Sequence, residues 1–78
     1  MIMLESVISD QATAKRISEL MLRMSDELNE SVRMVLDNCP ADEFFKYRRT
    51  IGGVMAELLE VLNPLYSIHP ALKPPGFE

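Results

Sequence analysis

The stretch FFKYRRTIGGVMAELLEVLNPL (residues 44–65) decides the fold. Apolar side chains recur in it at alternating steps of three and four residues: Phe44, Tyr47, Ile51, Val54, Leu58, Val61 and Leu65. This heptad spacing is typical of an amphipathic helix with a coiled-coil-like seam. Pro40 suits the first turn of such a helix, and Asp42 and Glu43 complement the positive end of its dipole. The pattern predicts a helix over residues 41–63, which Asn63-Pro64 ends or kinks, with room for one further turn.

Gly52 and Gly53 interrupt this helix at a cost of about 1 kcal/mol each relative to alanine. They do not form a phosphate-binding loop, because no Lys-Ser/Thr pair follows and no strand precedes them. Two interpretations remain: the pair marks a kink, or it lets a second helix approach closely. The heptad pattern continues in phase across the pair, which favours the close approach.

A second apolar stripe lies upstream, within residues 5–38, a window that contains neither glycine nor proline. Its members are Ala14, Ile17, Met21, Met24, Leu28 and Val35, and Ser31 fills the one polar place. The spacing predicts a helix over about 10–38. Ser9 and Asp10 supply an N-cap and an acid for its first turn. The helix stops before Pro40, because the residue before a proline disfavours helical geometry.

The connection between the two helices is short, so they are predicted to be antiparallel neighbours in a helical hairpin. Residues 64–78 are rich in proline and are predicted to form an extended, irregular tail. The hairpin brings the two ends of the chain together. We expect their apolar residues to pack on each other or on a partner: Ile2, Met3, Leu4, Val7 and Ile8 from one end, and Leu65, Tyr66, Ile68, Leu72 and Phe77 from the other.

Association with a second copy is expected from the size and content of the chain. A domain of 78 residues has a small core, and the single Cys39 cannot close an intrachain disulfide. A lone hairpin leaves the back of its seam exposed, whereas two hairpins form a four-helix bundle. We therefore predict a single all-α domain, residues 1–78, that forms a homodimer through both apolar stripes.

The charge of the chain favours a protein partner. Its formal net charge of −4 argues against a broad nucleic-acid or anionic membrane surface. The apolar start lacks the basic region of a targeting signal, and a reducing cytoplasm is the expected compartment. We predict a regulatory, adaptor or immunity-type interaction module, with Asp26, Glu27 and Glu30 as a second candidate surface for a partner.

Catalysis is the competing hypothesis. Glu57 and Glu60 are spaced like metal ligands, but no helix carries the Glu-x-x-His of di-iron bundles. The hairpin places Cys39 and His69 at opposite ends. A small-molecule enzyme or anionic-ligand binder would need Arg48, Arg49, Glu57 and Glu60 to converge at a dimer interface. No cofactor or metal is expected.

Overall fold

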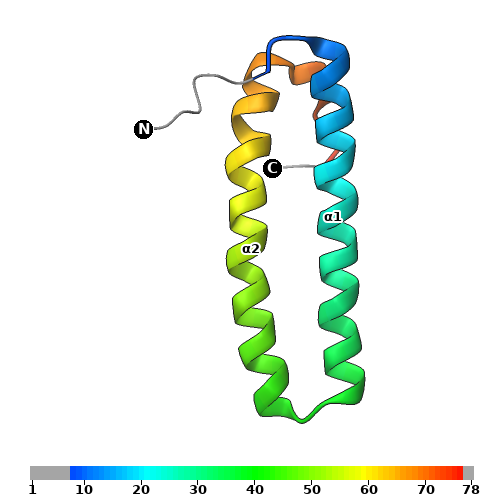
Figure 1. Cartoon of the computed structure of the whole chain (residues 1–78), viewed down its shortest axis with the longest axis vertical. Helices are drawn as coiled ribbons and strands as arrows, with labels where there is room; N and C mark the ends of the chain where they lie inside the picture. The colour runs from blue at the N-terminus through cyan, green and yellow to red at the C-terminus, as the bar shows by residue number, and fades with distance from the viewer. Residues whose placement is uncertain (1–7, 77–78) are drawn as a thin grey trace.

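The computed structural model describes residues 8–76 as two long antiparallel helices followed by a short turn of 3-10 helix. Helix α1 spans Gln11–Asn38, α2 spans Ala41–Ile68, and the 3-10 helix η2 spans Pro70–Leu72. The pair forms an elongated rod of 45 × 28 × 19 Å with the tight turn at one end (Figure 1). The predicted helical hairpin is confirmed.

Helix α1 ends at Asn38 as predicted and begins one residue later than predicted, with Asp10 rather than Ser9 as its N-cap. The carboxylate of Asp10 accepts hydrogen bonds from the backbone N–H of Thr13 at 2.8 Å and from its hydroxyl at 2.6 Å. The same two bonds, the hydroxyl bond first, hold the pKa of Asp10 below its usual value. At the other end, Cys39 is extended before Pro40, and its N–H donates to the carbonyl of Val35.

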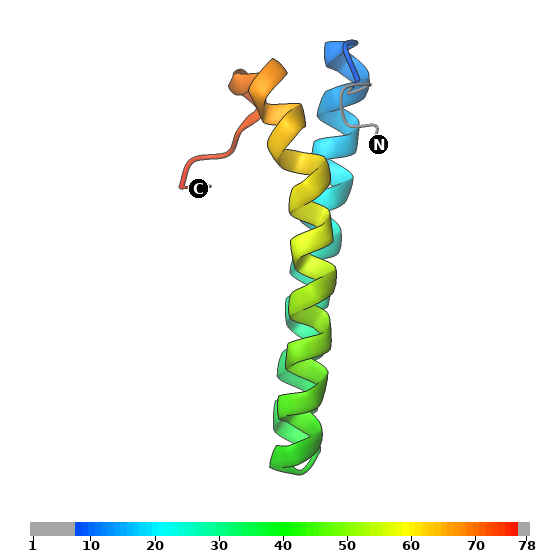
Figure 2. The same cartoon turned by 90° about the vertical axis from the view of Figure 1, so that its left-hand side faces the viewer.

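Helix α2 does not stop at Pro64. It continues to Ile68, so the predicted end at residue 63 and the extended conformation predicted for residues 64–68 are wrong, whereas the alternative of a kink at Asn63-Pro64 followed by one further turn agrees with the structure. A proline inside a helix removes its own N–H bond, and its ring crowds the carbonyl one turn earlier, which bends the helix. The later part of α2 leans away from the line of its first part (Figure 2). The continuation buries Leu65 and Tyr66, which an extended chain would leave in water.

The core lies at the end of the hairpin opposite the turn. Its buried residues are Ala14, Leu62, Leu65 and Tyr66, and the partly buried Ile8, Met21, Leu22 and Leu72 pack against them. The buried ring of His69 contacts the carbonyl of Ile8 through Nε2 at 3.0 Å. The two chain ends therefore meet as expected for Ile8, Leu65, Tyr66 and Leu72. The other partners proposed for this contact, Ile2, Met3, Leu4, Val7 and Phe77, lie outside the described residues, and Ile68 is exposed.

Three contacts between side chains fix the register of the two helices. The hydroxyls of Ser18 and Tyr66 are 2.5 Å apart, and those of Ser31 and Tyr47 are 2.8 Å apart. Between them, the Ser25 hydroxyl lies 3.7 Å from the sulfur of Met55. Ser31, the polar gap in the upstream stripe, is thus used to bond across the hairpin.

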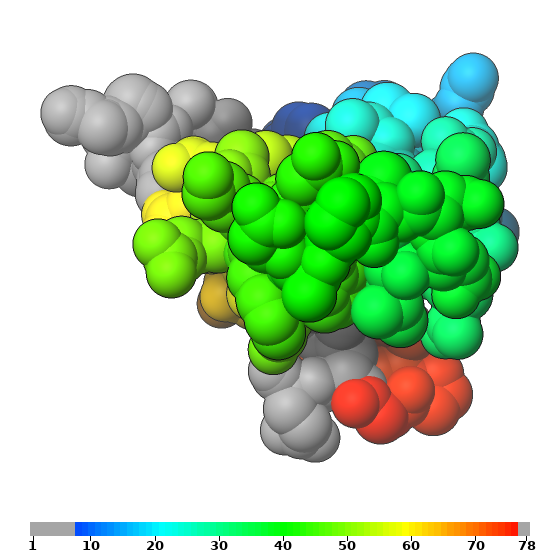
Figure 3. Space-filling model, turned by 90° about the horizontal axis from the view of Figure 1, so that it is seen from below, coloured from blue at the N-terminus to red at the C-terminus, as the bar shows by residue number. Residues whose placement is uncertain are grey.

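The chain after α2 returns along one side of the helix pair. Seen from the turn end, residues near 70–75 lie together beside the helices (Figure 3). Leu72 packs against the core from this side. The hairpin therefore has one side that the C-terminal segment covers and one that it does not.

Candidate interaction surface

The structure divides the predicted seam into two groups. Most of its residues are buried or half-buried between the helices: Ile17, Met21, Leu28, Val35, Phe44, Tyr47, Ile51, Leu58 and Leu65. Met24, Val54 and Val61 are instead 39%, 40% and 39% exposed. Neighbouring residues take their places inside the hairpin, chiefly Ser25, Met55 and Leu62.

Ser18 and Ser25 are interior residues that the sequence analysis missed. Only Ser31 was placed on the predicted stripe, yet Ser18 is 3% exposed and its hydroxyl bonds that of Tyr66. The signal was present in the spacing. Ser18 and Ser25 are seven residues apart, and each lies four residues after an apolar residue of the stripe, Ala14 and Met21. A small serine between the helices leaves room for a larger side chain of the facing helix, and its hydroxyl forms a hydrogen bond with the polar group of that side chain, as with tyrosine.

The residues displaced from the seam gather on one side of the hairpin. Ser25 and Met55 face each other across the hairpin, and Met24 and Val54 are the residues directly before them. In a pair of antiparallel helices, the residues directly before two facing residues both point to the same side of the pair. Leu20 and Ile17 lie one and two turns before Met24, and Val61 lies two turns after Val54. We call these five residues the open face: Ile17, Leu20, Met24, Val54 and Val61.

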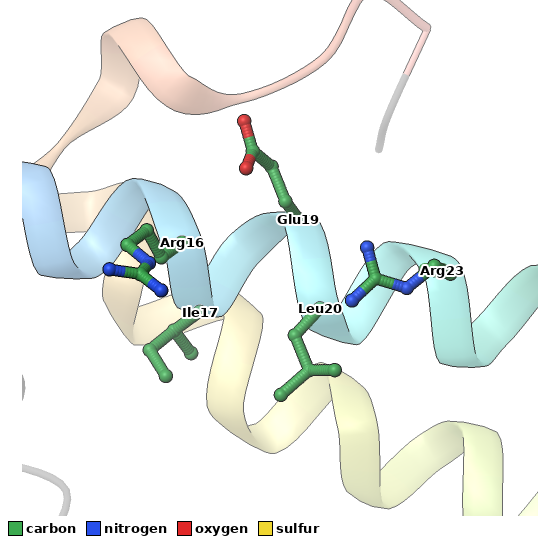
Figure 4. A pocket seen from close by; sticks show the side chains of 5 residues that line it. All are labelled: Arg16, Ile17, Glu19, Leu20 and Arg23. Atoms are coloured by element: carbon green, nitrogen blue, oxygen red, sulfur yellow. The ribbon is translucent and has the colours of Figure 1, made fainter.

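The open face lies opposite the C-terminal segment. Figure 4 shows Ile17 and Leu20 pointing away from that segment and Glu19 pointing toward it. On the covered side, Ser18 and Tyr66 are buried and Leu22 is half-buried. Every residue of the open face except Ile17 is exposed, at 38–40%. Among residues 8–76, the difference in burial marks the open face as an apolar strip that no other described segment covers.

A shallow concavity borders the open face on α1. It has a volume of about 410 Å³ and is lined by Arg16, Ile17, Glu19, Leu20 and Arg23 (Figure 4). All five residues belong to one helix, and all except Ile17 are exposed. The concavity is therefore a dent in a surface, suited to receive a side chain of another protein.

Charged residues follow the open face along both helices. On α1, Arg16 and Arg23 lie toward the core end and Glu27 lies toward the turn. On α2 the order of charge is reversed, with Glu57 and Glu60 toward the core end and Lys46 toward the turn, all of them exposed. Within residues 8–76, none of these side chains forms an ion pair. Their charges are therefore available to another molecule.

The proposed catalytic set is not assembled in the chain. Arg48, Arg49, Glu57 and Glu60 are all exposed along the length of α2, and they do not line the concavity on α1. Cys39 lies exposed at the turn, whereas His69 is buried at the far end. The described residues contain no group of three side chains that could hold a metal ion.

The glycine pair does not admit the neighbouring helix. Both glycines are exposed, and a Cβ atom added to Gly52 or Gly53 would meet nothing within 4 Å. Helix α2 also continues through them without a break. Within the described chain no helix approaches the pair, so the close approach expected from the sequence would have to come from the helix of another copy.

The acidic residues Asp26, Glu27 and Glu30 are exposed together on α1, as expected for a surface.

No helix within the described part of the chain is long and apolar enough to cross a membrane. Comparison with known protein families, curated proteins and solved structures finds no match. Function is therefore argued from the surface of the molecule.

Proposed function

We propose that this chain is a small protein–protein interaction module that works as a homodimeric four-helix bundle. The observation that carries the proposal is the open face, an apolar strip that runs over both helices and lies opposite the C-terminal segment. Exposed apolar strips of this kind, bordered by charge, are typical of surfaces that bind other proteins.

The surface area of the chain supports association. It exposes 5712 Å², whereas a compact protein of 8.9 kDa exposes about 4800 Å². The excess of about 900 Å² is close to the roughly 800 Å² that each partner buries in a standard interface. A second hairpin supplies an apolar surface of matching length, because it carries the same strip.

The described core is small for independent stability. Ala14, Ile51, Leu62, Leu65 and Tyr66 are the buried apolar residues among those described, and four of them form one cluster at one end. The half of the rod nearer the turn is held by half-buried residues such as Leu28, Val35 and Phe44. Small domains with so little buried surface and no disulfide are commonly stabilised by association.

A further protein partner would bind the outer surface of this bundle. The exposed carboxylates of Asp26, Glu27 and Glu30 give α1 an acidic outer patch, which suits a basic partner. Reversing the sign of all three charges is expected to abolish capture of such a partner. Unchanged capture by the reversed variant would remove the acidic patch from the proposal.

The molar mass in solution tests the dimer. Light scattering coupled to size exclusion, at loading concentrations from about 1 µM to 1 mM, is expected to give twice the chain mass at the upper end. Val61→Asp is expected to give the monomer mass. Leu59→Asp is the matched control, because Leu59 is 42% exposed on the same helix and lies outside the open face. A wild-type chain that stays monomeric throughout overturns the proposal.

A further inference from the structure

We infer that the two copies pack open face to open face, with the two-fold axis running along the helices. Both turns then lie at the same end of the bundle, and each α1 lies on the partner's α2. This inference rests on the proposed homodimer and adds the identity of the interface and the orientation of the copies. It is carried by the order of charges along the open face.

The register of the hairpin sets which residues share a height. Ser25 contacts Met55, so Arg23, two residues before Ser25, is level with Glu57, two residues after Met55. A two-fold axis along the helices leaves every residue at its own height in the partner. Arg23 of one copy therefore lies level with the partner's Glu57, and the symmetry repeats this contact on the other edge.

A second acid lies close to this contact. Glu60 is one helical turn beyond Glu57 toward the core end, so it lies between the heights of Arg23 and Arg16 in the facing copy. Side chains of this length span a helical turn, so both acids reach the arginines of the facing copy at the rim of the interface. Opposite charges therefore meet along the core-end part of each edge.

The apolar residues match in height as well. Ser18 lies opposite Tyr66 and Ser25 opposite Met55, which places Leu20 level with Val61. The partner's Val61 then enters the concavity between Ile17 and Leu20, with Arg16 and Arg23 on either side. The axis along the helices thus fills the concavity and pairs its two arginines with acids.

The alternative axis, across the helices, brings like charges together. It lays each α2 on the partner's α2 in the opposite direction. When the apolar strips overlap, Glu57 and Glu60 of one copy meet the same two residues of the other near the centre of the interface. Like charges placed opposite each other at an interface weaken binding, so this orientation is disfavoured.

Cys39 provides a direct measurement of the orientation, because it is the only cysteine in the sequence and is exposed at the turn. A nitroxide label on the wild-type chain allows the distance between the two labels of a dimer to be measured by pulsed electron paramagnetic resonance. With the axis along the helices, we expect a distance below about 30 Å, since neighbouring helices are about 10 Å apart. With the axis across them, the strips overlap near the height of Arg23 and Glu57, and the labels lie about 50 Å apart, at 1.5 Å per residue.

A charge exchange tests the Arg23 contact. Arg23→Glu and Glu57→Arg each place like charges at both copies of the contact and are expected to weaken the dimer about tenfold. An equimolar mixture of the two variants restores opposite charges at both contacts, so the mixed dimer is expected to regain the wild-type affinity. Arg33→Glu is the matched control, because Arg33 is exposed on α1 away from the open face.

The outcomes separate this inference from the proposed function. A dimer whose labels are about 50 Å apart overturns the orientation and leaves the homodimer intact. A mixture that dimerises no better than either variant overturns the Arg23–Glu57 contact. A chain that is monomeric at every concentration overturns the homodimer, and the inference with it. Short label distances together with recovery in the mixture support both.

Discussion

Replacing Leu65 with alanine is expected to remove a large part of the stability of the hairpin. Leu65 is 1% exposed and belongs to the buried cluster at the core end. Leucine-to-alanine changes at buried sites cost about 2.7–5.0 kcal/mol, depending on how far the cavity collapses. The cluster is small and close to the surface, so we expect about 3 kcal/mol. A chain of this length has a total free energy of unfolding of about 4–12 kcal/mol.

Urea unfolding followed by circular dichroism at 222 nm measures this effect, with all variants at one protein concentration because association adds to apparent stability. Leu59→Ala is the matched control: the same substitution in the same helix at a residue that is 42% exposed. We expect it to cost less than about 1 kcal/mol. Similar losses for Leu59→Ala and Leu65→Ala would refute the placement of the core.

Three further predictions concern the helices themselves. Gly52→Ala and Gly53→Ala are expected to raise the free energy of unfolding by up to about 1 kcal/mol each, because an added Cβ meets nothing within 4 Å. Thermal melts measure this change. A lower melting temperature in either variant would instead mean that a partner helix approaches the glycine pair in the dimer. Asp10→Ala is expected to lower the melting temperature at neutral pH, since it removes the cap on Thr13. The folded-state pKa of Asp10 is lowered, so its contribution is full above the unfolded pKa of about 3.9 and is lost as the pH falls through the folded value. Melts of both proteins should converge in acid, and a constant difference would contradict the role of the charge. Pro64→Ala is expected to raise the free energy of unfolding by about 1–3 kcal/mol, because it restores a hydrogen-bonded N–H inside α2. A lower free energy of unfolding would show that the bend at Pro64 is needed for the core residues to pack.

The sequence was sufficient to predict both helices and the turn between them. The period of the apolar residues is a property of each helix alone, and Asp10 and Pro40 mark boundaries through local hydrogen bonding and sterics. These features do not depend on what the helix packs against. The start of α2 at Ala41 and the end of α1 at Asn38 were therefore predicted correctly, and α1 begins at Gln11, one residue later than predicted, because Asp10 and not Ser9 is its N-cap.

The end of α2 could not be predicted by local rules. Pro64 lowers the helical preference of its own turn, which favours an end at residue 63. The free energy gained by burying Leu65 and Tyr66 opposes that preference, and the Tyr66 hydroxyl finds Ser18 far away in the sequence. The balance is decided by tertiary contacts, and these favour a bent helix that continues to Ile68.

The heptad period also could not identify which apolar residues remain exposed. The stripe of α2 is wide, with Val54 and Val61 on one edge and Met55 and Leu62 on the other, and one facing helix covers only part of it. The contacts with α1 decide which edge is covered, since Met55 faces Ser25 and Leu62 belongs to the core cluster with Ala14. Leu72 of the C-terminal segment packs against the same cluster and leaves Val54 and Val61 exposed. A period calculated from the helix alone carries no information on either packing partner.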